Sequence, residues 1–157
     1  MADKFVIDTN VAISANGKDT HASLACQFAC IEFLENCKKL HIAIDLTGLI
    51  MAEYARHLSY AGQPGVGDMF FKYLHDHQYS GKKIHTVVIT ESIDSNRGFD
   101  ELPENTLDNS DRKFLATAVV AKAKIVNATD SDWEEQINLL QLLNINLKQL
   151  CPEHSCK

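Results

Sequence analysis

Short apolar runs that alternate with helical segments limit most strongly what this chain can fold into. Five such runs are predicted as strands, at residues 4–8, 41–46, 83–90, 125–127 and 145–147. Between them lie helical patterns at residues 21–40, 47–60 and 111–124, one carrying Met69 to Leu74, and one at 133–143. Strands that alternate with helices form a parallel sheet covered on both faces. We therefore expect an α/β fold, a three-layer α/β/α sandwich with a central parallel sheet of about five strands.

Two of the helices carry start signals. Thr20 is expected to cap the helix at 21–40, and Thr47 the helix at 47–60. In the first of them, helical spacing predicts a core-facing side made of Leu24, Phe28, Ile31 and Leu34.

Acidic residues follow two of the predicted strands. Asp8 closes the first strand, and Asp130 and Asp132 follow the fourth. In parallel sheets, ligands bind outside the carboxyl ends of the strands. Asp8 can also be a turn or cap residue, and Asp130 or Ser131 can cap the helix that starts near Trp133. A helix cap explains one of Asp130 and Asp132 but not both.

Two further acids lie on the apolar side of helices. Asp111 precedes Phe114 and Leu115 by three and four residues, so it faces the core. Attraction to the helix dipole is the alternative explanation, but a solvent-facing acid satisfies the dipole without losing its hydration. Glu53 also falls beside an apolar stripe, and the neighbouring Arg56 is expected to point elsewhere. Divalent cations bind carboxylate oxygens and offset their mutual repulsion, so one metal site accounts for all four acids.

Four segments together resemble the PIN-domain nucleases. They are Phe5-Val-Ile-Asp-Thr-Asn-Val, Glu53 on a helix, Asp111 heading a helix that runs into Phe-Leu-Ala-Thr-Ala, and Thr129-Asp-Ser-Asp-Trp. The resemblance implies that Asp8, Glu53, Asp111 and Asp130 are the catalytic metal ligands, with Asp132 as an accessory ligand and Asn10 and Thr129 as polar support. It also implies Mg²⁺ or Mn²⁺ as cofactor, single-stranded RNA as substrate, products with 5′-phosphate and 3′-hydroxyl ends, and a protein inhibitor or antitoxin and a homodimer as partners.

Two metal ions about 3.5–4 Å apart would activate a water and stabilise the leaving oxygen. Phosphate contacts are expected from basic residues, namely Arg56, Lys82, Lys83, Arg112 and Lys113. Residues 91–107 show no periodicity and are rich in acids, and we expect this acidic segment to be a mobile lid or a docking loop.

Three other classes of function compete with this interpretation. A haloacid-dehalogenase-type phosphatase needs a second acid two residues after the first, where Asn10 stands. A receiver domain needs a phosphorylated Asp at the third strand, which ends Ile89–Thr90–Glu91. A non-catalytic PIN-like scaffold that binds nucleic acid or protein is the stronger alternative.

Composition adds limits on class and compartment. The net charge of −6 argues against a protein that coats nucleic acid, because such binding needs Lys and Arg. Four site acids contribute −4 of that charge, which two divalent cations would offset. With 157 residues, the chain is expected to be one nuclease domain at 1–150 followed by a tail at 151–157. A membrane span and an export signal are not expected, so the cytoplasm is the predicted location.

The five cysteines are expected to be reduced, because their number is odd and their spacing is not that of a disulfide framework. In the tail, Cys151, His154 and Cys156 give a weak zinc signal, against which stands a frayed terminus.

Overall fold

Five strands form one parallel sheet in the order β3-β2-β1-β4-β5. The structure, a computed structural model, describes residues 2–155. The strands are β1 (Lys4–Ile7), β2 (His41–Asp45), β3 (Ile84–Val87), β4 (Lys124–Asn127) and β5 (Leu147–Gln149). The predicted α/β/α sandwich with a five-stranded parallel sheet is therefore confirmed, and β1 is its central strand.

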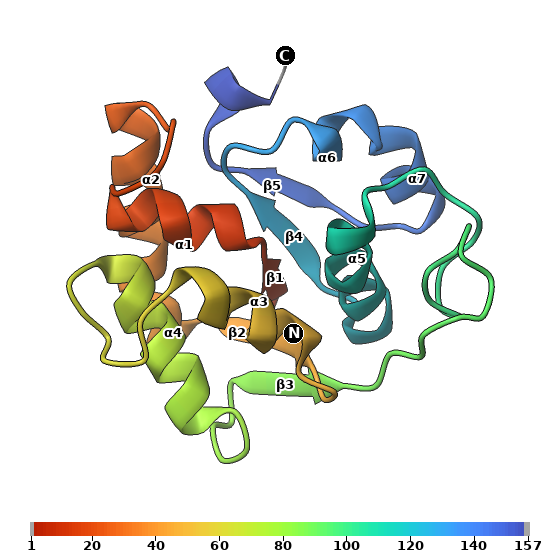
Figure 1. Ribbon diagram of the computed structural model, residues 1–157, viewed down its shortest axis with the longest axis horizontal. Coiled ribbons are helices and arrows are strands. Elements are labelled where there is room, and N and C mark those ends of the chain that lie inside the picture. Colours follow the sequence, from red (N-terminus) through yellow and green to blue (C-terminus); the bar gives the residue numbers. More distant parts are fainter. Residues whose placement is uncertain (1, 156–157) are drawn as a thin grey trace.

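Helices cover both faces of this sheet. They are α1 (Thr9–Asn16), α2 (Leu24–Glu35), α3 (Leu49–His57), α4 (Val66–His77), α5 (Asn109–Ala121), α6 (Asp132–Glu135) and α7 (Ile137–Leu142), with two short 3-10 helices, η1 (Cys37–Lys39) and η2 (Pro152–His154). In Figure 1, α1, α2 and α4 lie to the left of the strands, and α5, α6 and α7 lie to the right. Within the described residues, none of these helices combines the length and apolarity that crossing a membrane requires.

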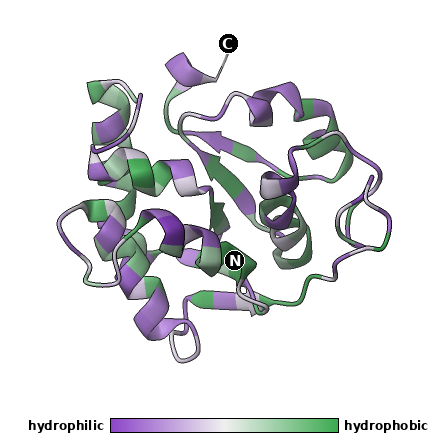
Figure 2. Ribbon diagram, viewed as in Figure 1, coloured by the Kyte–Doolittle hydropathy of each residue, from purple (hydrophilic) through white to green (hydrophobic). Residues whose placement is uncertain are grey.

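The core is formed by the apolar strands and the helix faces packed on them. Figure 2 shows β1 and β4 in the colour of hydrophobic residues. Val6, Ile7, Ile125 and Val126 are fully buried there. This is why continuous apolar runs, rather than alternating ones, predict the sheet: both of its faces are covered.

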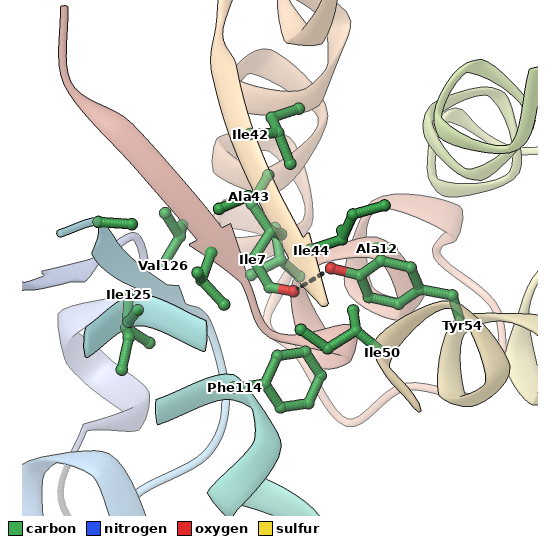
Figure 3. Close-up of a cluster of buried hydrophobic side chains, with 14 of the residues drawn as sticks. Ile7, Ala12, Ile42, Ala43, Ile44, Ile50, Tyr54, Phe114, Ile125 and Val126 are labelled. Atoms are coloured by element: carbon green, nitrogen blue, oxygen red, sulfur yellow. Dashed lines mark hydrogen bonds between the residues drawn. The ribbon is translucent and has the colours of Figure 1, made fainter. Parts of the chain in front are cut away.

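A hydrogen bond across the core sets the position of α3 against the central strand. Figure 3 shows the hydroxyl group of Tyr54 donating to the carbonyl oxygen of Ile7, with Phe114 of α5 in the same cluster. Ile7 directly precedes Asp8, and Tyr54 directly follows Glu53. The bond therefore brings the two acids of the sequence pattern to the same end of the sheet.

Helix α1 was missing from the predicted elements. Its eight residues are mostly buried, and Val11 and Ala12 are completely so. A helix buried on most sides shows no apolar stripe, and periodicity cannot detect it. A β-carbon at Gly67 of α4 would lie 2.1 Å from the carbonyl oxygen of Ala12, so α1 and α4 cross in close contact.

The predicted core side of α2 is wrong for Leu24 and Phe28, while Leu34 is buried and Ile31 packs against the core, as predicted. Leu24 and Phe28 are 66% and 61% exposed, whereas Cys26, Cys30 and Leu34 are buried. Both sets have helical spacing, but the cysteines act as small hydrophobic residues and pack in the core. The caps differ too: the Ser23 hydroxyl accepts from the backbone N–H of Cys26 and caps α2 in place of Thr20.

At the start of α3, Gly48 occupies the N-cap position predicted for Thr47. The carboxylate of Asp45, which ends β2, accepts from the backbone N–H groups of Gly48, Leu49 and Ile50 at 2.8–2.9 Å. An acid at the end of a strand thus acts as a helix cap here, the role that was also considered for Asp8.

Candidate metal centre

Three aspartates meet at the carboxyl edge of the sheet. Asp8 follows β1, Asp130 follows β4, and Asp111 lies in the first turn of α5. Each offers a carboxylate oxygen, and these oxygens all lie within 4.8 Å of one another. Asp8 and Asp111 are buried, and Asp130 is half-buried. The sequence pattern therefore correctly brings together three of its four principal acids, although their role as ligands stays a prediction.

Burial and mutual repulsion both oppose ionisation of this cluster. Burial raises the pKa of Asp8 to about 7, with a hydrogen bond from Trp133 opposing the rise and the charges of Asp130 and Glu53 adding to it. Burial likewise raises the pKa of Asp111 to about 8, and the charges of Asp8 and Asp130 add to it. At neutral pH the cluster therefore tends to bind protons or cations.

Asp111 is not the cap of its helix. The N-cap of α5 is Asp108, whose carboxylate accepts from the backbone N–H of Ser110 at 2.9 Å. Asp111 is only 7% exposed and faces the other acids. The helix-dipole explanation therefore leaves its burial unexplained.

Indole and amide groups hold the two strand-end acids in place. The indole N–H of Trp133 donates to Asp8 Oδ2 at 2.6 Å. Asn10 accepts from the backbone N–H groups of Ala128 and Thr129 at 2.8 and 3.1 Å, and donates to Asn127 Oδ1 at 2.9 Å. These bonds agree with the supporting role that the resemblance implies for Asn10, which stays a prediction, whereas Thr129 enters them through its backbone.

Glu53 lies beside the three aspartates rather than within their group. Its Oε1 forms an ion pair with Lys113 Nζ at 2.6 Å, and its Oε2 accepts from the Thr9 hydroxyl. Arg56 also approaches Glu53 Oε1, at 3.8 Å, so the expectation that Arg56 points elsewhere is wrong. Lys113 is 60 residues from Glu53 in sequence, and no local pattern indicates this pair.

A shallow hollow of about 500 Å³ opens over the cluster. Among the residues around it are Asp8, Glu53, Asp130 and Asp132, together with two histidines that the sequence pattern did not select, His21 and His57. The backbone N–H of Asp132 donates to Asp130 Oδ1 at 2.9 Å, so Asp130 also contributes to the start of α6. The acids are open to solvent through this hollow.

Four of the five predicted phosphate-binding residues are not placed for that role. Lys82 and Lys83 precede β3 and so lie at the amino edge of the sheet, opposite the acids. Lys113 is buried against Glu53, and its ammonium group also donates to the carbonyl oxygen of Ser110. Arg112 is 7% exposed. Only Arg56, whose side chain is 69% exposed, keeps a free approach to the site.

Arg112 instead anchors the acidic segment, residues 91–107. Its guanidinium donates to the carbonyl oxygens of Ser95 and Asn105 at 2.7 and 3.0 Å and to the side chain of Asn105 at 3.0 Å. Gly98 lies so close that a β-carbon there would be 2.6 Å from Arg112 Cδ. The segment also buries Phe99, Leu102 and Leu107. These contacts argue against a mobile lid, and the docking loop stays a prediction.

Comparison with known proteins adds a likeness of fold. No protein-family model matches the chain, and no curated protein sequence matches it. Among solved structures, a similar one is the crystal structure of VapBC2 from Rickettsia felis bound to a DNA fragment from their promoter. The likeness covers 93% of this chain and 98% of that chain, at 15% sequence identity and a TM-score of 0.45. The chemistry of the site therefore follows from its own residues.

Proposed function

We propose that this chain is a PIN-like, metal-dependent endoribonuclease that cuts single-stranded RNA. The observation that carries the proposal is the group of Asp8, Asp111 and Asp130, whose carboxylate oxygens lie within 4.8 Å of one another at the carboxyl edge of a parallel sheet. Buried carboxylates this close repel each other unless protons or cations neutralise them. The resemblance of the four sequence segments to the PIN-domain nucleases points to the same chemistry.

The donor set fits a hard divalent cation. Carboxylate oxygens suit Mg²⁺ and Mn²⁺, whereas zinc prefers thiolate and imidazole ligands. Asp8, Asp111 and Asp130 would hold the ion or ions, with Asp132 at the rim of the same hollow as an accessory ligand and Glu53 alongside. When bound, such ions supply an activated water and stabilise the charge that develops on the phosphodiester.

The protein's own groups would prepare this site in three ways. Trp133 fixes the orientation of Asp8 by donating to one of its oxygens. Asn10 holds the turn that carries Asp130. Lys113 compensates the charge of Glu53, so that this buried acid adds less repulsion to the three aspartates.

A second hollow adjoins the first and offers a path for the RNA backbone. The two share Ile13 and His57, and the second is also lined by Lys18 and Arg56. Cationic side chains that follow a groove bind the phosphates of single strands. We assign Lys18 and Arg56 to this path as the cationic groups, with His57 between the two hollows, in place of the four basic residues that lie elsewhere.

Binding without cleavage tests this path. In EDTA, Lys18→Ala and Arg56→Ala should weaken binding of a single-stranded oligoribonucleotide and reduce its dependence on salt, because each removes one phosphate contact. Lys82→Ala, a change of the same charge at the opposite edge of the sheet, serves as the control. If all three variants lose the same RNA affinity, binding depends on the net charge of the protein and not on this path.

Cleavage tests the function itself. Single-stranded RNA should be cut in Mn²⁺ or Mg²⁺ and left intact in EDTA. Asp8→Asn and Asp130→Asn should abolish cutting, while Asp76→Asn, an exposed acid on α4, should not. Folded Asp8→Asn and Asp130→Asn proteins that cut at the wild-type rate would refute the nuclease proposal, and RNA binding without cutting in the wild type would favour the scaffold alternative.

A protein inhibitor or antitoxin, a homodimeric state and a cytoplasmic location follow from the resemblance and from composition, and they stay predictions.

A further inference from the structure

After β5 the chain turns back beside α2 (Figure 1). Three cysteine sulfurs lie close together there. Cys26 and Cys30 lie one turn apart on the buried face of α2, and Cys151 follows β5. Their Sγ atoms all lie within 4.8 Å of one another. Cys26 and Cys151 form a disulfide, so the prediction of reduced thiols is wrong for these two residues. A disulfide accounts for two of these sulfurs, and the third, Cys30 Sγ, lies within 4.8 Å of both of them.

A histidine and an acid close the outer side of this cysteine cluster. Possible ligand atoms of Glu153 and His154, on η2, lie within 4.8 Å of each other and of Cys26 Sγ. His154 Nε2 accepts from the backbone N–H of Ser23 at 3.1 Å, and Glu153 accepts from the Ser23 hydroxyl at 3.4 Å. These contacts fix residues 151–155 against the start of α2 and contradict a frayed terminus.

The cysteine just after α2 shows what a purely structural thiol looks like in this fold. Cys37, in η1, is buried and, like Cys30, stands outside any disulfide among residues 2–155. Within the same described range, Cys37 belongs to no cluster of possible metal ligands, whereas Cys30 does. Burial as a small hydrophobic residue explains Cys37. It leaves the convergence of Cys30 on two other sulfurs unexplained.

We propose that, once the disulfide is reduced, Cys26, Cys30, Cys151 and His154 bind one Zn²⁺ ion at a site separate from the acidic one. Thiolate and imidazole ligands select zinc, and three cysteines with one histidine form a common closed zinc site. The pairs are spaced as Cys-x3-Cys and Cys-x2-His, which matches the short spacings of such sites. Cys156, part of the weak signal in the sequence, lies outside the described residues and is not needed.

A dithiol can reduce the disulfide and so free the thiols that would bind zinc. Two electrons and two protons from the dithiol convert the Cys26–Cys151 disulfide into two thiols, and the dithiol leaves as its own disulfide. Zinc then displaces three protons, one from each cysteine thiol, to solvent. In the reverse direction the oxidised dithiol, itself a disulfide, accepts two electrons from the Cys26 and Cys151 thiolates and two protons from solvent; Cys30 takes up a third proton, and the zinc ion leaves.

Loading of this site would act on the acidic hollow through one histidine. The ring of His154 contacts the ring of His21 edge to face, with centroids 5.7 Å apart. His21 lines the hollow over the aspartates. A metal ion bound by His154 would therefore restrain a residue at the mouth of the candidate nuclease site.

Cobalt is the probe for the test, because Co²⁺ bound by thiolates in tetrahedral geometry has intense charge-transfer and visible bands that oxygen-bound octahedral Co²⁺ lacks. The dithiol-reduced wild-type protein, kept free of oxygen, should develop these bands up to one equivalent of Co²⁺ and lose them when Zn²⁺ is added. The oxidised protein should not show them. Reduced wild type with only the weak spectrum of oxygen-bound Co²⁺ would overturn the proposal.

Matched variants locate the ion. Cys30→Ser should lower the affinity for Co²⁺ by at least roughly tenfold, because changes to residues that only support metal ligands already cost about that much. Cys37→Ser should bind Co²⁺ as the wild type does. Equal binding by both variants would overturn the site, and an unchanged spectrum in His154→Ala would overturn the fourth ligand. Asp8→Asn should keep the thiolate bands, so this test and the test of the nuclease proposal can fail independently.

Discussion

Replacing Asp111 by Asn should flatten the pH dependence of stability of the metal-free protein between pH 5 and pH 7. An ordinary aspartate ionises near a pKa of 3.8, but burial raises the pKa of Asp111 in the folded protein to about 8. Between these values the folded state keeps a proton that the unfolded state has lost. A group of this kind stabilises the fold at low pH, and that stability disappears as the pH rises from about 4 toward 8.

The size of the effect follows from the shift. Each pH unit inside this window lowers the free energy of unfolding by about 1.4 kcal/mol per such group, or about 2.7 kcal/mol from pH 5 to pH 7. Asp8, with a pKa of about 7, contributes in the same direction. Asp111→Asn removes one of the two contributions and should therefore reduce the pH-dependent loss by about 2.7 kcal/mol.

Urea unfolding in EDTA at pH 5, 6 and 7 measures this difference. Asp76→Asn is the control, because the neighbouring Lys72 lowers the pKa of that exposed acid, and its ionisation is complete below pH 5. Burial lowers the pKa of His85, which adds stability as the pH rises, but equally in all three proteins. If Asp111→Asn loses as much stability as wild type between pH 5 and pH 7, then Asp111 is already ionised in the folded protein and the account of a self-repelling cluster fails.

Three further outcomes follow from individual contacts. Mn²⁺ at a hundredfold above its dissociation constant should stabilise the protein against urea by about 2.7 kcal/mol. It should also quench the fluorescence of Trp133, the chain's one tryptophan, which contacts Asp8. Asp8→Asn should show much less stabilisation and much less quenching. Lys113→Met should destabilise the fold by about 3 kcal/mol because it leaves the buried Glu53 with only the exposed Arg56 at 3.8 Å and the Thr9 hydroxyl as partners, and adding Glu53→Gln should restore most of that loss. Arg112→Met should speed hydrogen exchange throughout the acidic segment and leave exchange in β1 unchanged. If the acidic segment of the variant exchanges as slowly as that of the wild type, the guanidinium of Arg112 is not its anchor.

The sheet and its acidic edge could be predicted because each depends on local sequence. Apolar runs such as Phe5-Val-Ile identify strands covered on both faces, and an acid that directly follows a strand must lie at its carboxyl end. Asp111 was recognisable because helical spacing alone places it beside Phe114 and Leu115.

The missed features depend on contacts between distant parts of the chain. The ion pair of Lys113 with Glu53 spans 60 residues, and the disulfide of Cys26 with Cys151 spans 125. Neither leaves a local pattern, so a basic residue near the site was taken for a phosphate contact and two cysteines were taken for free thiols. Likewise, the anchoring of the acidic segment by Arg112 is invisible until the fold places them together.

The position of β1 has a consequence for how the molecule is assembled. The disulfide closes residues 26–151 into a covalent ring that contains β2, β3, β4 and β5, while β1 stands outside it. Yet β1 pairs with both β2 and β4, so without it the sheet divides into two halves. The strand is therefore the part of the sheet that can be removed without cutting the disulfide-closed ring. A peptide of residues 1–25 and the ring that remains are two fragments suited to a complementation experiment. Their association would join the two halves of the sheet and bring Asp8 to the other acids in a single step.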